Sequence, residues 1–220
     1  MSNIFSYDSK LTQVLGYVAD LFFLNVIFLI CCLPVFTIGA AQAGLYTATR
    51  QMIDPNDDRS VIKAFFRGFA NGFGKISLIS TFFLVLDVIL LYTLFMSIDY
   101  AQIGIHWAFP TVLLALCLLV HSLLPVFHYQ FSCGPFQLFR NCILLLIAYP
   151  LRSIAVMVLT WAPAALFFLK PQMFLDLSAL FVMFYYSVAF LFGAYIMVKP
   201  FKQLIDDMDI NEEKEVADNE

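Results

Sequence analysis

The sequence predicts an all-α protein, a polytopic transmembrane helical bundle with five spans and short cytoplasmic interfacial helices. The first observation behind this prediction is composition: 62% of residues are hydrophobic and 13% charged, with a mean hydropathy of +0.86, which is too apolar for a soluble core inside a solvated shell. The second is that five apolar stretches are long enough to cross a bilayer. The third is the distribution of Lys and Arg: if the five stretches cross the membrane in alternating directions, most of these residues lie on one side of it.

The five predicted spans lie in a transmembrane domain over residues 1–205. Each approaches the roughly 17 to 25 residues that cross a hydrocarbon layer of about 30 Å. A sixth apolar run, 141–149, stops at Pro150 and is too short to span, so we expect it at the interface or partway into the bilayer. The predicted spans are 16–38, 76–98, 107–129, 153–169 and 173–198.

The distribution of cations predicts the orientation of these spans. Positive loop residues favour the cytoplasm, because translocating them is unfavourable. With five alternating spans, only Lys10 and Lys170 fall on one side, and the other ten Lys and Arg residues share the opposite side. We therefore predict that the N-terminus is outside and the C-terminus cytoplasmic. The ten residues on the cytoplasmic side are Arg50, Arg59, Lys63, Arg67, Lys75, Arg140, Arg152, Lys199, Lys202 and Lys214.

The C-terminal segment 206–220 differs from the rest of the chain. It holds eight acidic residues against Lys214 alone, so it contributes −7 to a net charge of −4 and leaves the remainder at +3. Low hydrophobicity and high charge predict a cytoplasmic tail that is disordered when free. Nucleic-acid binding is not expected, because the only long soluble segment is acidic and the basic residues follow the membrane surface.

An alternative for the first span is a cleaved secretory signal. Its apolar region would be Val18 to Pro34, and Ala41-Gln42-Ala43 resembles a cleavage site. However, the N-terminal region lacks the usual positive cluster, since it contains Asp8, Lys10 and Asp20, and the apolar stretch is long for a signal. An uncleaved first span is the favoured interpretation.

A second alternative is that Pro34, Thr37 and Gly39 form a helix break that ends the first span early. Proline removes a backbone donor, and glycine permits irregular backbone. A short helix over 40–53 would then run to the turn at 54–56. Irregular backbone inside a membrane needs protein or water partners, so we expect the break to pack against other helices.

The segment before the second span has the pattern of an interfacial amphipathic helix. Ile62, Phe65, Phe66 and Phe69 recur at steps of three and four residues, and Arg67 lies on the remaining surface. The simplest interpretation is a lead-in to the span along the membrane surface. Phe66 and Arg67 are also candidate contacts for a cytoplasmic partner.

A similar lead-in precedes the fourth span. Phe139 and Arg140 follow Gly134-Pro135 and echo the Phe66-Arg67 pair. Each lead-in is followed by an outward span, a short turn and an inward span, which suggests two similarly oriented units of about 70 residues after an extra first helix. Phe139 and Arg140 are therefore candidate partner contacts as well.

Three polar residues inside predicted spans form a candidate intramembrane site. A carboxylate near the bilayer centre carries a penalty of a few kcal/mol unless it is paired, so Asp87 should face the bundle or a wet cavity. His121 is its expected partner, and Asn25 is expected to bridge helices. In some membrane proteins, residues of this kind relay protons or bind a polar solute. In others, they only form a hydrogen bond that holds two helices together.

Other chemistry finds little support in the sequence. His121 and His128 are seven residues apart with no Glu or Cys at a familiar metal spacing, so we expect no metal site. A phosphate loop, a G-x-S-x-G elbow and an H-E-x-x-H helix are all missing, so no cofactor and no enzymatic activity are expected. The cysteines form an odd set without a C-x-x-C pair, which predicts free thiols used as small apolar residues. They are Cys31, Cys32, Cys117, Cys133 and Cys142.

Several motifs occur in an order that resembles the YesL-like family of bacterial integral membrane proteins. They are Asn25, the run from Leu33 to Ala40, Leu45-Tyr46 and Phe66-Arg67-Gly68-Phe69, and the resemblance extends from about Lys10 to Lys202. It implies a multi-pass protein of a bacterial, Gram-positive cytoplasmic membrane. Relatives of this kind are often encoded beside carbohydrate uptake and breakdown functions. The family has no established activity, so no catalytic residue can be carried over.

These observations lead to two expectations about function. The first is an accessory or regulatory component of carbohydrate uptake or utilisation, which touches the lipid bilayer and another membrane complex such as a sugar importer. The alternative is a small-solute transporter or permease with a polar mid-membrane site. A membrane enzyme ranks third, because no nucleophile or metal set supports it.

Overall fold

The computed structural model describes residues 10–53, 60–99, 105–130 and 135–198. All regular elements in these ranges are helical and none is a strand, so the predicted all-α class is confirmed. The described residues include five helices that are long and apolar enough to cross a membrane, as predicted. These candidate spans are Thr12–Cys31, Lys75–Met96, Ala108–Tyr129, Pro150–Leu169 and Ser178–Val198.

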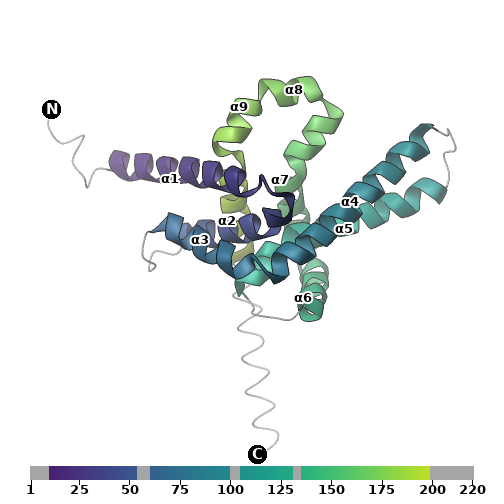
Figure 1. Cartoon of the computed structure of the whole chain (residues 1–220), viewed down its shortest axis with the longest axis horizontal. Coiled ribbons are helices and arrows are strands. Elements are labelled where there is room, and N and C mark those ends of the chain that lie inside the picture. The colour runs from purple at the N-terminus through teal and green to yellow at the C-terminus, as the bar shows by residue number, and fades with distance from the viewer. Residues whose placement is uncertain (1–9, 54–59, 100–104, 131–134, 199–220) are drawn as a thin grey trace, which may run out of the picture.

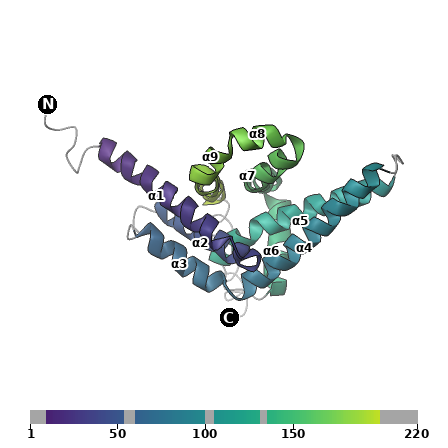
Figure 2. The same ribbon diagram turned by 45° about the horizontal axis from the view of Figure 1, so that its top comes forward.

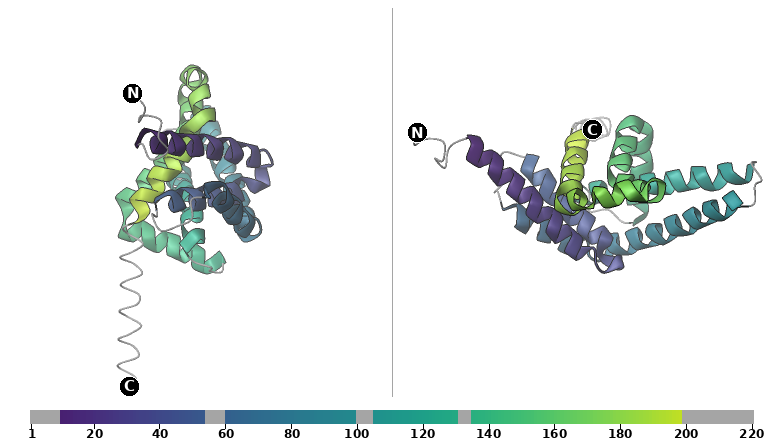
Figure 3. Two further views of the ribbon diagram at one scale, coloured as in Figure 1. Left: turned by 90° about the vertical axis from the view of Figure 1, so that its left-hand side faces the viewer. Right: turned by 90° about the horizontal axis from the view of Figure 1, so that it is seen from above.

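The long helices form three arms that diverge from a common base (Figures 1 and 2). The first arm is α1 (Lys10–Cys31), and the second is the antiparallel pair α4 (Lys75–Asp99) and α5 (Ile105–Gln130). The third arm rises along α7 (Pro150–Leu169), turns through short helices and returns along the last candidate span (Figure 3).

The base of the molecule is built around α2 (Ile38–Ile53), a short helix with most of its residues buried. It contacts α1, α3 (Val61–Gly72), α4 and α5. The α2 sequence from Gly39 to Gly44 contains only Gly, Ala and Gln, and such small residues let helix backbones approach closely. Side-chain size on α2 therefore sets how closely α1, α3, α4 and α5 approach it.

Glycines make the closest contacts between α2 and α3. A Cβ atom on Gly44 would lie 2.7 Å from the carbonyl oxygen of Phe65. On α3, a Cβ on Gly68 would collide with the side chain of Thr47, and one on Gly72 would lie 3.0 Å from Cβ of Ala43. Gly68 and Gly72 form a G-x-x-x-G pair, the spacing that brings helix backbones together in membranes.

The first predicted span, 16–38, is wrong at its end, because α1 stops at Cys31. Pro34 has no N–H to continue the helix ladder, and it disfavours helical geometry at the residue before it. The chain passes through the short 3-10 turn η1 (Val35–Thr37) and reverses into α2. The first helix therefore ends early, as expected if Pro34, Thr37 and Gly39 form a helix break.

The fifth predicted span, 173–198, also differs at its start. Its first residues belong to α8 (Pro171–Asp176), and the candidate span begins two residues later with α9 (Ser178–Leu180). It continues through a π-helical turn, η2 (Phe181–Tyr185), and an α-helix over 186–198. A π turn widens the backbone and leaves groups that need partners outside the helix.

The second lead-in and the short apolar run form one helix, α6 (Pro135–Ala148), which packs against α5 and α7 at the base. Arg140 on this helix is exposed. The side chain of Phe139 and the acidic tail 206–220 lie outside the residues whose structure is described.

We expect Gly44→Ala to lower the free energy of unfolding by up to about 2 kcal/mol. The added methyl would overlap the Phe65 carbonyl, which costs about 1–3 kcal/mol, and the gain in helix propensity offsets about 1 kcal/mol of that. The matched control is Gly16→Ala on α1, because nothing lies within 4 Å of a Cβ there. Thermal unfolding in lipid nanodiscs measures both. Equal shifts in the two variants would contradict the close contact.

Candidate functional site

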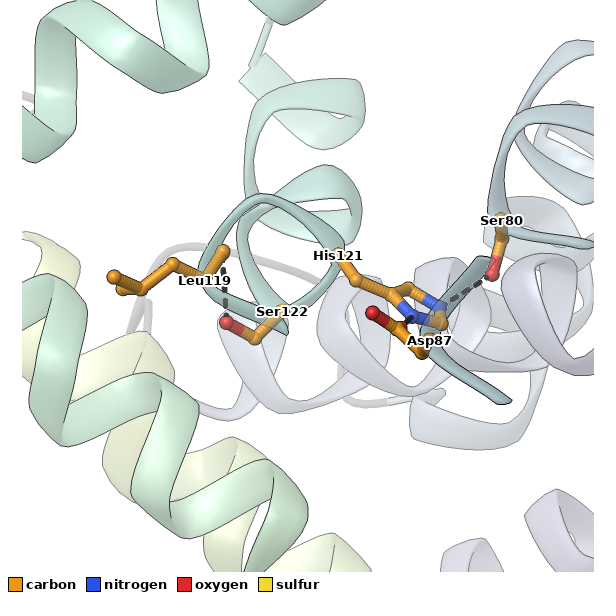
Figure 4. A network of polar contacts seen from close by, with 5 residues as sticks. All are labelled: Ser80, Asp87, Leu119, His121 and Ser122. Carbon is orange, nitrogen blue, oxygen red and sulfur yellow. Dashed lines mark hydrogen bonds and ion pairs between the residues drawn. The ribbon is translucent and has the colours of Figure 1, made fainter. Parts of the chain in front are cut away.

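Three buried polar side chains link α4 to α5 (Figure 4). His121 Nδ1 lies 3.0 Å from Asp87 Oδ2, and His121 Nε2 lies 2.8 Å from Ser80 Oγ. The exposed fractions are 5% for Asp87 and 1% for both His121 and Ser80. Asp87 lies about 18 Å along the helix from Lys75, at a rise of about 1.5 Å per residue, so it sits near the middle of the span. The structure thus brings the predicted pair into direct contact.

This three-residue chain can hold a proton in two arrangements. With a neutral imidazole, Nδ1–H donates to Asp87 and Nε2 accepts a hydrogen bond from the Ser80 hydroxyl. With a protonated imidazole, both ring nitrogens donate and Asp87 forms an ion pair with His121. Pairing of either kind reduces the penalty for a carboxylate in lipid. Asp87 Oδ1 has no hydrogen-bond partner among the described residues.

The helix break and the polar site are physically connected through Gly39. Ser80 and Asp87 are seven residues apart, which places both on the face of α4 that meets α5. A Cβ atom on Gly39 would collide with Cβ of Ser80 and lie 2.9 Å from its Oγ. Only glycine at the start of α2 therefore lets this helix pack against the hydroxyl that bonds His121.

The break itself is fastened by Thr37, which is buried. Its Oγ1 lies 2.6 Å from the Cys31 carbonyl oxygen and 2.7 Å from that of Pro34. The hydroxyl ties the end of α1 to the turn that follows, so the candidate break residues Pro34, Thr37 and Gly39 hold the site in place rather than contribute chemistry to it.

Ser80, His121 and Asp87 have the connectivity of a hydrolase triad, in which serine bonds Nε2 and aspartate bonds Nδ1. A nucleophile must also reach its substrate. Ser80 is sealed against Gly39 and is not among the described residues that line the neighbouring cavity. We therefore assign Ser80 a positioning role toward His121.

A half-open cavity of about 210 Å³ lies beside His121, and residues of α2 and of all three arms line it. Most of its wall is apolar. Gln42 Oε1 and Trp161 Nε1, both from residues of the wall, have no hydrogen-bond partner among the described residues. An unpaired buried polar group costs about 1–3 kcal/mol. Both atoms are fully buried. Other lining residues include Phe28, Leu84, Thr160 and Tyr186.

The cavity and the polar chain share His121. Its ring makes an edge-to-face contact with Trp161 at 5.2 Å between centroids, and it lines the cavity with that residue. The sequence did not single out Gln42 or Trp161 as site residues. Two features of the sequence could have drawn attention to them. Gln42 is an amide within a run of small residues, and Trp161 lies inside a predicted span rather than at the membrane interface, where tryptophan is enriched.

Asn25 lies in a different cluster from Asp87 and His121. It is fully buried on α1, and its Nδ2 donates to the carbonyl oxygens of Phe181 at 3.1 Å and Val182 at 2.6 Å. Its Oδ1 accepts from the Ser187 N–H at 3.1 Å, and the Ser187 hydroxyl donates to the Leu21 carbonyl at 2.7 Å. Asn25 therefore satisfies the backbone of the π turn and fastens α1 to the last span.

The apolar residues predicted to form one stripe on α3, Ile62, Phe65, Phe66 and Phe69, are divided between a buried and an exposed face. Phe65 is fully buried and Phe69 packs against the core, whereas Ile62 is 42% and Phe66 50% exposed. The stripe is divided because the small residues of α3 pack on α2, which leaves Ile62 and Phe66 on the outer side. We call this exposed set the α3 outer face; it comprises Ile62, Lys63, Phe66 and Arg67.

The cysteines that the structure describes are free thiols. Cys142 on α6 is fully buried, and burial raises the pKa of its thiol to about 12. In the described part of the chain, His, Cys, Asp and Glu side chains form no group of three that could hold a metal ion.

Residues 21–94 match the sequence profile of a family described as "Protein of unknown function, DUF624". This stretch is about a third of the chain and includes Asn25, the break, α2, α3, Ser80 and Asp87, whereas His121 lies outside it. No curated protein and no solved structure matches the chain significantly. The match therefore identifies a region of the sequence and supplies no activity.

We expect Asn25→Ala to lower the free energy of unfolding by about 2 kcal/mol, because it leaves two carbonyls of the π turn and the N–H of Ser187 without this partner. Ser178→Ala is the matched control, since it removes an exposed hydroxyl that bonds the Leu175 carbonyl nearby. Chemical unfolding in nanodiscs measures the difference. A variant at Asn25 as stable as the control would show that the π turn needs no such support.

Proposed function

We propose that this chain is an accessory or regulatory component of a bacterial cytoplasmic membrane that acts beside a carbohydrate uptake complex such as a sugar importer. Its N-terminus is outside and its C-terminus cytoplasmic, as the distribution of cations predicts. The DUF624 match supports the resemblance to the YesL-like family, whose members carry this domain. The link to carbohydrate utilisation rests on that resemblance.

The α3 outer face is the observation that carries the accessory role. The opposite face of α3 already packs on α2 through glycine contacts, so the outer face is not needed to hold the bundle together. Its exposed Phe66 and Arg67 are of types enriched where protein interfaces lose water. Arg140 on α6 adds an exposed cation at the same base of the molecule.

Charge reversal of Arg67 and Arg140 to Glu should reduce recovery of the partner at least tenfold, because like charges then oppose each other at a specific contact. The measurement is crosslinking in native membranes, purification of the full chain, and quantification of the crosslinked neighbour. Lys170→Glu is the control, since Lys170 is exposed and predicted on the other side of the membrane. The same neighbour at the same level in the Arg67 and Arg140 variant would count against this role, provided that the melting temperature is unchanged.

A small-solute transporter is the second candidate, and one specific arrangement favours it. The Asp87–His121–Ser80 chain lies mid-span and directly beside the cavity, and it can hold a proton in two arrangements. Polar groups that face a cavity near the bilayer midplane are typical of transport sites.

In liposomes with an imposed pH gradient, the transporter candidate predicts uptake of a labelled monosaccharide, and Asp87→Asn should abolish that uptake because the amide cannot accept a proton from His121. Asp176→Asn serves as the control, since this carboxylate is exposed on α8 and should leave uptake unchanged. Uptake that persists in Asp87→Asn would remove the carboxylate from the mechanism. No uptake of any monosaccharide by the unaltered protein would leave the accessory role in place.

A further inference from the structure

The short helices at the base of the molecule carry cations and no carboxylate. The sequences of α2, α3 and α6 contain neither Asp nor Glu, and their cations are Arg50, Lys63, Arg67 and Arg140. Three of these four are exposed, with Arg50 half-buried, and among the described residues no carboxylate pairs with any of them. The base therefore presents positive charge that the described part of the chain does not neutralise.

The connection between α2 and α3 reduces this charge but does not cancel it. Residues 54–59 contain three carboxylates and Arg59. With that connection counted, residues 38–75 and 135–152 hold seven cations against three carboxylates, a net charge of +4. A surface with an excess of one sign attracts a segment of the opposite sign. The base thus favours an acidic counterpart.

The chain contains such a counterpart in its acidic tail, residues 206–220. The tail has a net charge of −7 and includes a few apolar residues, namely Met208, Ile210 and Val216. The α3 outer face is complementary in both respects, since it combines two exposed cations with two exposed apolar side chains. Charge and residue type therefore match between the two segments.

The acidic tail is attached close to the α3 outer face. The last span descends to the base, where Met197 is fully buried in the same hydrophobic cluster as Phe65 of α3. From Val198 to Asp206 an extended chain covers up to about 28 Å, and the tail itself covers up to about 50 Å. The 12 residues of α3 extend over only about 18 Å. The tail is long enough to reach the outer face and to follow its whole length.

We propose that the acidic tail binds the α3 outer face of its own chain and covers it. Its carboxylates bind Lys63 and Arg67, and Arg140 adds a cation at the same base. One exposed ion pair contributes little. However, a tethered segment is present at an effective concentration on the order of millimolar, so several weak pairs that act together are enough.

Coverage of this face would regulate the accessory role. A partner that uses the α3 outer face must first displace the acidic tail, so the tail controls access to the surface. This consequence rests on the proposed function, whereas the contact within the chain does not.

An anionic lipid headgroup is the principal competing occupant, because Lys and Arg near the cytoplasmic surface of a membrane attract anionic lipids. The two occupants differ in one measurable property. Phosphatidylglycerol would displace the tail from the face if lipid were the stronger counter-charge, and it would leave the tail in place otherwise.

The experiment is photo-crosslinking of the full chain in nanodiscs, with p-benzoylphenylalanine in place of Phe66. Phe168 receives the same substitution as the matched control, since it is also exposed, at 65%, but is predicted on the other side of the membrane. After illumination and proteolysis, mass spectrometry quantifies the fraction of each probe that is joined to residues 206–220. Nanodiscs of phosphatidylcholine alone are compared with nanodiscs that also contain phosphatidylglycerol.

We expect the tail crosslink at position 66 to exceed that at position 168 about tenfold, as a high effective concentration predicts. It should fall about fivefold when NaCl rises from about 50 mM to about 500 mM, because salt screens exposed charges. Phosphatidylglycerol should leave it in place. Exchange of the eight tail acids for their amides retains the length of the tail and should lower the crosslink to the level of the control. These acids are Asp206, Asp207, Asp209, Glu212, Glu213, Glu215, Asp218 and Glu220.

Any of four results would overturn the proposal. They are equal crosslinking at positions 66 and 168, a tail crosslink that salt or neutralisation does not weaken, its loss in phosphatidylglycerol, and a product of twice the mass of the chain. Loss in phosphatidylglycerol would identify anionic lipid as the occupant, and the double mass would identify the tail of a second copy. The salt series uses the unaltered tail, so the test stands without the neutralised variant. Because the purified chain is used alone, the result is independent of whether a partner co-purifies.

Discussion

A carboxylate near the middle of an apolar helix is the constraint on which the rest of this structure depends. Asp87 is tolerable in lipid because His121 pairs with it, and His121 is held in turn by Ser80. Ser80 is positioned where α2 begins, and only a glycine at position 39 allows α2 to approach that closely. One chain of contacts thus joins α5, α4 and α2, and it links the break after α1 to the polar centre of the molecule.

The central position of α2 has consequences for both the cavity and the surface. Its small residues bring the arms together at the base, and Gln42 is the polar side chain that α2 contributes to the cavity. The small residues of α3 pack against the same helix, α2, so Phe66 and Arg67 lie on the opposite, exposed side of α3. A change of packing at the cavity therefore has a short physical path to the α3 outer face, through one helix and its glycine contacts.

Much of the fold could be predicted from the sequence, because a lipid bilayer restricts both the length and the polarity of the segments that cross it. Apolar length predicted five candidate spans, and the scarcity of polar residues inside them singled out Asp87 and His121. The cavity was not predictable, because only the folded chain brings Gln42 of α2 and Trp161 of α7 into one wall. The partner of Asn25 was hidden for a similar reason, since a π turn has no sequence signature. The division of the apolar residues of α3 between a buried and an exposed face depends on close packing against α2, which the hydrophobic pattern alone does not reveal.

The most direct test of this account is a double-mutant cycle on the pair at its centre, with Asp87→Leu, His121→Leu and the combined variant compared by unfolding in nanodiscs. A cycle isolates the energy that two residues share from the separate effect of each substitution. The account predicts a coupling energy of at least about 1 kcal/mol, because each single change leaves the other group buried without its partner. Strictly additive effects would contradict it, since α4 and α5 would then be held together without the contact between Asp87 and His121.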